Sequence, residues 1–175
     1  RKIFIVSNCQ KPDWLRETNS LEWVDHSEFI PPDSLPTFNS HAIEASLHKI
    51  PGLSEHFIYF NDDFILGDPV QKSDFFDELG RAIISLEGYG VVNKTYARYL
   101  KKDYLTASNN SRKLIASKYN ISMTRLHKHL PYAHRKSNIF DFENQFPNNF
   151  RDTINNRHRS ANDINIMSFA AHYFG

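Results

Sequence analysis

The sequence contains a single cysteine, Cys9, among 175 residues, so no disulfide can form within the chain. It has no apolar run close to the ~18 residues of a membrane-spanning helix, and no signal-peptide pattern at its start. Cys9 follows the first apolar run and is expected to be a buried structural thiol rather than a nucleophile. Because the chain begins at Arg1 and enters a strand-like segment at once, we expect it to be part of a longer protein.

Apolar residues are plentiful, at 40% with 14% aromatic, which excludes a wholly disordered chain. At this length one domain covering residues 1–175 is expected. Charge is divided unevenly: residues 1–93 hold 7 Lys or Arg and 15 Asp or Glu, whereas residues 94–175 hold 14 and 5. An acidic half suits a metal and a basic half suits phosphate, although the halves could also simply complement each other. No motif of a known nucleic-acid-binding module accompanies the basic residues, so no nucleic acid partner is expected.

The order of the predicted elements favours an α/β fold with a mostly parallel sheet, flanking helices and a helical C-terminal third. Strands are indicated where β-branched and aromatic residues run together, and helices where apolar residues recur every three or four positions. The predicted strands cover residues 2–8, 21–26, 56–60 and about 88–92. The predicted helices cover about 39–50, 110–119, 136–145 and 162–174. A strand, a helix and a strand in succession predict a right-handed parallel crossover over residues 21–60.

Two adjacent carboxylates, Asp62 and Asp63, follow Asn61 at the end of the third predicted strand. Ligands of open α/β sheets bind beyond the carboxyl ends of the strands. Adjacent acids repel each other unless a cation lies between them, so the pair predicts a site for a divalent metal. An ordinary Asx-type turn is the alternative, but the apolar residues on both sides favour a buried segment.

The helix predicted before this strand places His41, Glu44 and His48 together, on the face opposite its apolar residues. Their spacing differs from the H-E-x-x-H pattern of zinc hydrolases and does not favour a self-contained zinc site. Glu44 could be an exposed helix carboxylate, or it could support the acidic strand tip.

Three histidines lie in the basic stretch of residues 125–136, namely His127, His129 and His134. Histidine can move a proton near neutral pH, but the stretch could equally be a solvated basic face. Composition alone does not choose among the three.

A second basic group, Arg157 to Arg159, precedes Ser160, which pairs with Asp163 in the pattern of a capping box for the last predicted helix. A helix N-terminus and arginine side chains both bind phosphate. Positive charge at a helix start costs about 0.3–1 kcal/mol, and a bound anion would remove that conflict. Phosphate binding is therefore favoured over a surface loop.

Two long runs, IPPDSLPTFNSHAIE at residues 30–44 and LHKIPGLSEHFIYFNDD at residues 47–63, resemble the second conserved region of the Stealth family. This family includes bacterial capsular polysaccharide phosphotransferases and the animal lysosomal-enzyme N-acetylglucosamine-1-phosphotransferase. His129-Leu130-Pro131 resembles the third conserved region, and residues 159–163 with the helix after them resemble the fourth. The first conserved region is expected to precede Arg1, so the chain is expected to be a fragment of the phosphotransferase domain.

The resemblance implies transfer of a sugar 1-phosphate from a nucleotide sugar to a hydroxyl of an acceptor glycan, with release of nucleoside monophosphate. The residues that it implies are Glu44, Asn61, Asp62, Asp63, His129 and Arg159. Mg²⁺ or Mn²⁺ is expected on Asp62 and Asp63, and Asn61 joins the substrate contacts expected from Asn39, His41, Arg157 and Ser160.

Two alternatives to phosphotransfer stay open. A metal-dependent glycosyltransferase would release nucleoside diphosphate instead, and a non-catalytic glycan-binding module would stack sugars on Trp14, Trp23 or tyrosines. A bacterial capsule enzyme of this kind is expected in the cytoplasm, either free or at the periphery of the inner membrane.

Overall fold

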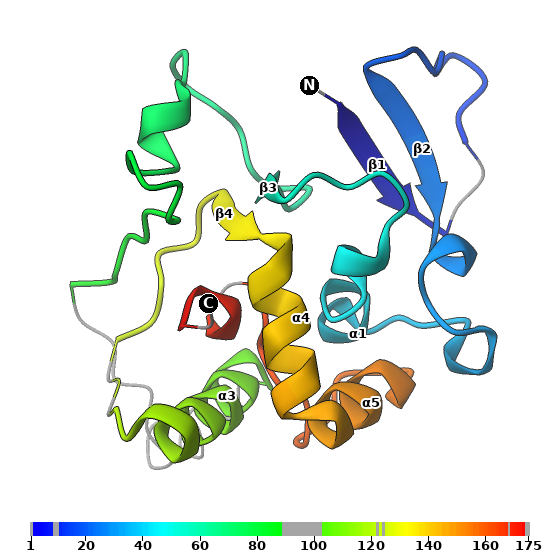
Figure 1. Cartoon of the computed structure of the whole chain (residues 1–175). Coiled ribbons are helices and arrows are strands. Elements are labelled where there is room, and N and C mark those ends of the chain that lie inside the picture. The colour runs from blue at the N-terminus through cyan, green and yellow to red at the C-terminus, as the bar shows by residue number, and fades with distance from the viewer. Residues whose placement is uncertain are drawn as a thin grey trace.

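The computed structural model of the chain describes residues 2–8, 11–88, 103–121, 123, 125–167 and 169–173, and Figure 1 shows the arrangement of its elements. The strands are β1 (Ile3–Ser7), β2 (Leu21–Asp25), β3 (His56–Tyr59) and β4 (Tyr132–Arg135). The α-helices are α1 (Ser40–Glu44), α3 (Asp103–Tyr119), α4 (Lys136–Gln145) and α5 (Pro147–Asn155). Short 3₁₀ helices cover His26–Glu28, Pro32–Ser34, Leu47–Lys49, Lys72–Asp74 and Ala170–Tyr173.

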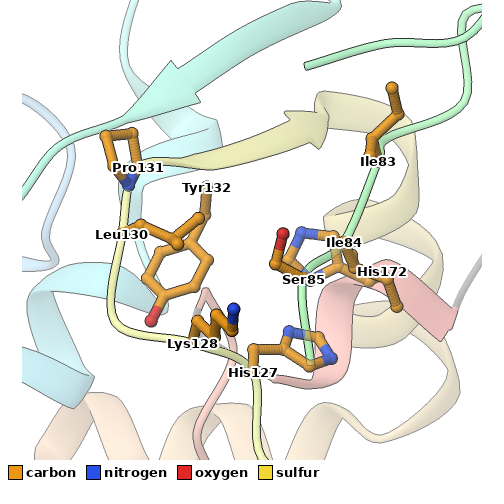
Figure 2. A pocket seen from close by; sticks show the side chains of 9 residues that line it. All are labelled: Ile83, Ile84, Ser85, His127, Lys128, Leu130, Pro131, Tyr132 and His172. Atoms are coloured by element: carbon orange, nitrogen blue, oxygen red, sulfur yellow. The ribbon is translucent and has the colours of Figure 1, made fainter. Parts of the chain in front are cut away.

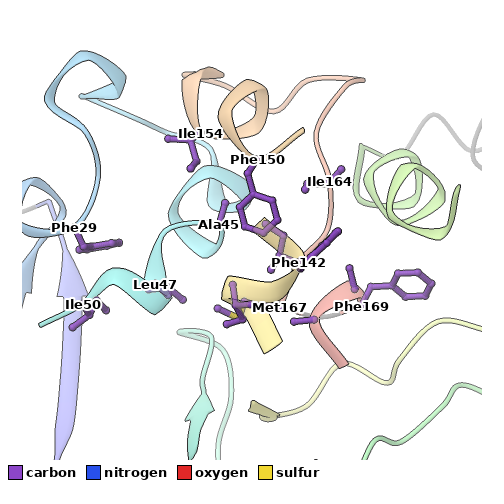
Figure 3. Close-up of a cluster of buried hydrophobic side chains, with 14 of the residues drawn as sticks. Phe29, Ala45, Leu47, Ile50, Phe142, Phe150, Ile154, Ile164, Met167 and Phe169 are labelled. Atoms are coloured by element: carbon purple, nitrogen blue, oxygen red, sulfur yellow. The ribbon is translucent and has the colours of Figure 1, made fainter. Parts of the chain in front are cut away.

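The hydrophobic core lies where α4 and α5 meet the segment after α1 and the buried C-terminal segment (Figure 3). The rings of Phe142 and Phe150 are fully buried and pack edge to face, with their centroids 5.0 Å apart. The sequence prediction missed α5, although Pro147 at its first position is typical of a helix start. Phe150 and Ile154, one turn apart, are the apolar face that this helix buries.

The strands form two separate two-stranded sheets rather than one. β1 and β2 are parallel, as predicted, and pair from Ile3 with Leu21 to Ser7 with Asp25. β3 pairs instead with β4, antiparallel, so the predicted parallel crossover is wrong and a mostly parallel sheet is not confirmed. The connection from β2 to β3 covers residues 26–55 and is long enough for a crossover, but α1 and short 3₁₀ turns are its only helical parts, and it contains no long helix of the kind that usually packs across a parallel sheet. β3 alternates between exposed and half-buried residues, as an antiparallel strand with one solvated face does.

The predicted helices meet different outcomes. α4 has the predicted bounds, whereas α3 begins seven residues before the predicted Asn110. The helix predicted over residues 39–50 is divided into α1 and a 3₁₀ turn, and the chain then reverses at Gly52, whose φ is +76°.

The helix predicted over residues 162–174 is wrong, because the described residues of this stretch form a single 3₁₀ turn, at Ala170–Tyr173. Residues 163–167 are all buried, which suits an irregular segment packed on all sides better than an amphipathic helix. Side-chain hydroxyls supply the hydrogen bonds that a helix would have made. Ser111 Oγ accepts from Asn165 N at 2.9 Å and donates to Asn165 O at 2.9 Å, and Thr153 Oγ1 accepts from Ile164 N at 3.1 Å.

Cys9 and all but the first residue of the strand predicted at 88–92 lie outside the described residues. Across the described part of the chain, none of the helices combines the length and the apolar character needed to cross a bilayer.

Candidate active site

The two adjacent carboxylates lie on a turn that follows β3. Phe64 N donates to Asn61 O at 3.2 Å, which closes the turn and places Asp62 and Asp63 at its two central positions. Both carboxylates are exposed, and so are Ile58 and Phe60 before them, at 37% and 41% of their surface. The predicted buried segment is therefore wrong, while the predicted position just after a strand is confirmed.

Asp63 pairs with His129, which lies 66 positions further along the chain. The distance from His129 Nε2 to Asp63 Oδ2 is 3.1 Å, and both side chains are more than half exposed. A carboxylate only accepts hydrogen bonds, so Nε2 is the donor and Nδ1 is the nitrogen that can take a proton. The structure thus singles out His129 from the three histidines of the basic stretch.

Aromatic rings fix this pair at the end of the β3–β4 sheet. Phe64 packs edge-on against the His129 ring, with the centroids 4.7 Å apart, and also contacts Tyr132 at 6.1 Å. Tyr132 in β4 lies opposite Tyr59 in β3, and their rings stack at 6.5 Å. Antiparallel pairing thus brings the turn after β3 next to the loop before β4.

Glu44, at the end of α1, is buried, whereas the sequence placed it on a face directed away from the core. Tyr59 Oη donates to Glu44 Oε1 at 3.2 Å. Burial raises the pKa of the Glu44 carboxyl, and the neighbouring His41, the hydrogen bond from Tyr59, and the electrostatic effects of Arg159 and His129 oppose the rise. Glu44, His129 and Arg159 are therefore electrostatic neighbours.

Tyr59 connects Glu44 with the acidic turn and was missed by the sequence analysis, which counted it among apolar strand residues. Its hydroxyl lies 2.5 Å from Asn61 Oδ1 as well as near Glu44. Burial and the negative charges of Glu44 and Asp62 raise the pKa of Tyr59, which keeps the hydroxyl protonated as a donor. Strand alternation was the available signal, because it places Tyr59 on the face opposite the exposed Ile58.

Arg159 donates from its guanidinium to Ser40 Oγ, at the start of α1, at 2.9 Å. Arg157 and Arg159 are both exposed, and Ser160 is half-buried beside them. No helix starts at Ser160, so the predicted phosphate site at a helix N-terminus is wrong. The two guanidinium groups themselves are still available to an anion.

Asn39 and His41 lie under this surface, around the buried carboxylate of Asp163. Asp163 Oδ2 accepts from Asn39 Nδ2 at 2.9 Å, and His41 Nδ1 lies 3.2 Å away. Asp163 Oδ1 accepts from Asn156 Nδ2 at 2.7 Å. Burial alone would raise the pKa of Asp163, but the hydrogen bonds from His41, Ser160, Asn156 and Asn39 lower it overall. These bonds join α1 to the segment that carries Arg157 and Arg159.

The histidines and the glutamate predicted on one face of the first helix contact three different partners. His41 contacts Asp163 and Glu44 contacts Tyr59, whereas His48 Nε2 lies 2.7 Å from Glu143 Oε2 on α4. They therefore do not form one metal site.

Asp62, Asp63 and the side-chain oxygen of Asn61 offer oxygen ligands for a metal. Within the described ranges, no group of three His, Cys, Asp or Glu side chains is arranged to hold a metal ion. Mg²⁺ is usually bound by one or two carboxylates together with substrate phosphates and water. The turn after β3 fits that shared kind of site better than a site made entirely by the protein.

A small pocket lies behind the loop that carries His129 (Figure 2). His127 and His172 line it together with Ser85 and Tyr132. The ring centroids of His127 and His172 lie 4.9 Å apart. His134 packs against His172 from the other side, with the ring centroids 4.3 Å apart. Burial lowers the pKa of His127 to about 3 and that of His172 to about 4, and burial also lowers the pKa of His134. These three histidines are thus neutral at pH 7 and separate from the exposed His129.

Two family models match the chain. That of Stealth protein conserved region 2 matches residues 1–84, and that of conserved region 3 matches residues 128–175. The chain belongs to the Stealth family, as the resemblance in its sequence implied. Arg159 lies within the match to conserved region 3, so the likeness of residues 159–163 to a fourth region is not upheld.

Relatives of the chain include enzymes of bacterial polysaccharide synthesis. It is similar to the capsular polysaccharide phosphotransferase SacB of Neisseria meningitidis serogroup A, at 43% identity over 99% of this chain and 32% of the relative. The capsular polysaccharide phosphotransferase fcs1 of Haemophilus influenzae is also 43% identical, over 99% of this chain and 48% of the relative. An exopolysaccharide phosphotransferase of Streptomyces coelicolor is 39% identical over 99% of this chain and 30% of the relative. The chain thus spans between about a third and a half of the length of these relatives.

Proposed function

We propose that the protein is a phosphotransferase of polysaccharide synthesis that moves a sugar 1-phosphate from a nucleotide sugar to a hydroxyl of an acceptor glycan. The observation that carries the proposal is the pairing of Asp63 with His129 next to Glu44 and Arg159. A carboxylate that orients a histidine is a common arrangement for proton transfer from a hydroxyl. The names of the relatives support phosphotransfer in capsule and exopolysaccharide synthesis.

His129 acts as the base in this mechanism. Its Nδ1 takes the proton of the acceptor hydroxyl while Asp63 holds Nε2 and stabilises the imidazolium that forms. The acceptor oxygen then bonds to the phosphorus that carries the sugar. The bond from that phosphorus to the bridging oxygen breaks, and nucleoside monophosphate leaves with that oxygen.

Arg159 binds the phosphoryl group that is transferred, and Ser40 holds its guanidinium in place. Phosphoryl transfer depends chiefly on positioning and charge neutralisation, which suits this arrangement. Asp62, with Asn61 and Asp63, would hold Mg²⁺ or Mn²⁺, and that ion would neutralise charge on the diphosphate of the donor. The Tyr59 hydroxyl, which contacts both Glu44 and Asn61, holds the Asn61 side chain in place. We place the reaction in the cytoplasm, where nucleotide sugars are made.

Analysis of the spent donor tests this proposal. The complete protein is incubated with a panel of nucleotide sugars, an acceptor oligosaccharide and Mg²⁺ or Mn²⁺, and the nucleotide products are separated by chromatography. Nucleoside monophosphate, with a phosphodiester in the glycan product, is expected. Nucleoside diphosphate would instead identify a glycosyltransferase, and glycan binding without any turnover would identify a binding module.

A further inference from the structure

An exposed pair of stacked aromatic rings lies beside the arginines of the candidate site. The rings of Phe38 and His158 are nearly parallel, at 13°, with their centroids 5.4 Å apart. Phe38 nevertheless exposes 63% of its surface, and His158 is also exposed. A large aromatic residue that is both ordered against a neighbour and open to solvent is a suitable surface for a flat ligand.

The polypeptide backbone holds these two rings in place. Phe38 N donates to Arg157 O at 2.8 Å, which fixes the segment before α1 against the segment after α5. Next to it, Asn39 Nδ2 donates to Asn156 O at 3.1 Å and lies 3.4 Å from His158 O. The same amide is bonded to the buried Asp163. The surface is therefore formed before any ligand arrives, which lowers the entropy cost of binding.

Positive charge borders the ring pair on one side. Arg157 and Arg159 flank His158 in the chain, and both are exposed. Arg159 contacts Ser40, two residues after Phe38, and its charge acts on Glu44 in the candidate site. A ligand lying across this surface would thus have its flat part on the rings and its anionic part on the arginines, next to Ser40 at the start of α1.

We propose that Phe38 and His158 bind the nucleobase of a nucleotide, whose phosphates extend over Arg157 and Arg159. Aromatic rings stack on any nucleobase, and arginine binds phosphate through paired N–H donors. A neutral sugar could also pack on Phe38, but it would leave the two guanidinium groups without an anion. The inference rests on the proposed function, because the nucleotide would be that of the sugar donor.

Binding of nucleotides and of a base-free analogue tests the inference without relying on turnover. Isothermal titration calorimetry on the complete protein, with Mg²⁺ present, compares UDP and ADP with inorganic pyrophosphate. Removing the ring in Phe38→Ala is expected to weaken the binding of UDP and ADP by roughly 5- to 150-fold, the range of one stacked base. Pyrophosphate binding is expected to stay the same, whereas Arg159→Ala weakens all three ligands.

Two further variants control the experiment. Phe38→Trp restores a ring and is expected to retain nucleotide affinity. Tyr119→Ala, which removes another exposed aromatic ring at the end of α3, is expected to leave the affinities unchanged.

Several results would overturn the inference: no nucleotide binding by the unaltered protein, equal nucleotide affinity in Phe38→Ala, or an equal loss for nucleotide and pyrophosphate. Loss of affinity for the acceptor oligosaccharide alone would also overturn it, because the rings would then bind a sugar. If nucleotide binding depends on Phe38 but the spent donor is a diphosphate, this inference stands and the proposed phosphotransfer fails.

Discussion

Asp63 and His129 form the contact on which the proposed chemistry depends most directly. Replacing Asp63 by Asn keeps the size of the side chain but removes the charge that stabilises a protonated His129. We expect kcat of the complete protein to fall about 10²- to 10⁴-fold, the usual contribution of proton transfer by a positioned side chain. The exposed Asp68, which follows in the same loop, is the matched control, and Asp68→Asn is expected to retain activity.

The double variant shows whether the two residues act as one unit. If they do, the kcat of the double variant Asp63→Asn, His129→Gln is little lower than that of His129→Gln alone, because effects within a catalytic unit are not additive. Steady-state kinetics of the four proteins measures this. Losses that multiply would mean that Asp63 and His129 act separately, with Asp63 serving as a metal ligand only.

Phe64 is the side chain that keeps His129 and the acidic turn in register. It contacts the His129 ring directly and follows Asp63 in the chain. Phe64→Leu is expected to lower kcat about 10-fold or more with little change in KM, since small displacements of reacting groups are costly. Phe64→Tyr should retain the activity. Phe60→Leu is the control, because the Phe60 ring packs against that of Phe64, with the centroids 6.3 Å apart. A similar loss of kcat in Phe60→Leu would contradict a specific role of Phe64.

At the scale of elements, the buried carboxylate of Asp163 joins α1 to the segment after α5. It accepts hydrogen bonds from two asparagine side chains and from Ser160 N. Asp163→Asn replaces one acceptor oxygen by a donor that faces other donors. We expect a loss of about 2–4 kcal/mol in the free energy of unfolding, measured by urea denaturation.

Asp152→Asn is the control for this substitution, because Asp152 is an exposed acid on the neighbouring helix α5. Its effect is expected to stay within about 0.5 kcal/mol, as for most surface substitutions. Equal stability of Asp163→Asn and Asp152→Asn would contradict the structural role of Asp163.

Asp163 also shows why part of the fold was not predictable from the sequence. Its spacing from Ser160 is that of a capping box, and Ser160 N does donate to its carboxylate at 2.9 Å. The helix does not follow, because the hydroxyl of Ser111, 54 positions before Asn165, supplies hydrogen bonds to the Asn165 backbone instead. α4, whose apolar spacing and length are local properties, was predictable to the residue.

The candidate site shows the same difference between local patterns, which the sequence reveals, and long-range contacts, which it does not. The acidic turn was found because a polar tip after an apolar run is a local pattern. The antiparallel pairing of β3 with β4 joins residues 56–59 to residues 132–135, and no local pattern shows it. That pairing places His129 next to Asp63, and it explains why composition left three histidines equal while the structure distinguishes one.

At the scale of the whole molecule, buried neutral histidines set the response of stability to acid. His127, His134 and His172 have lowered pKa values because burial disfavours their charged forms, and burial lowers the pKa of His48 in the same way. Below the ordinary value of 6.5, the unfolded chain binds protons that the folded chain does not, so stability falls as the pH falls. Glu44 opposes this, since its raised pKa favours proton binding by the folded state above about pH 4.5.

Each of the three histidines contributes a slope of about 1.4 kcal/mol per pH unit when the unfolded form is fully protonated and the folded form is not. We therefore expect the free energy of unfolding to fall steeply between about pH 6 and 5, by up to about 4 kcal/mol before the opposing effect of Glu44. The carboxylates of lowered pKa, such as Asp163 and Glu143, weaken the fold only below their ordinary values of 3.8 and 4.5. Urea denaturation at several pH values measures the slope.

His127→Phe identifies the source of this slope. His127 lines the pocket behind the His129 loop, and phenylalanine replaces its ring by one that cannot take a proton. The variant is expected to reduce the slope by about 1.4 kcal/mol per pH unit, the effect of one proton. Tyr173→Phe is the control: it removes the hydroxyl 3.2 Å from His127 Nε2 but leaves the titrating ring, so stability falls at every pH while the slope is kept. An unchanged slope in His127→Phe would assign the acid sensitivity to groups outside the buried histidine cluster.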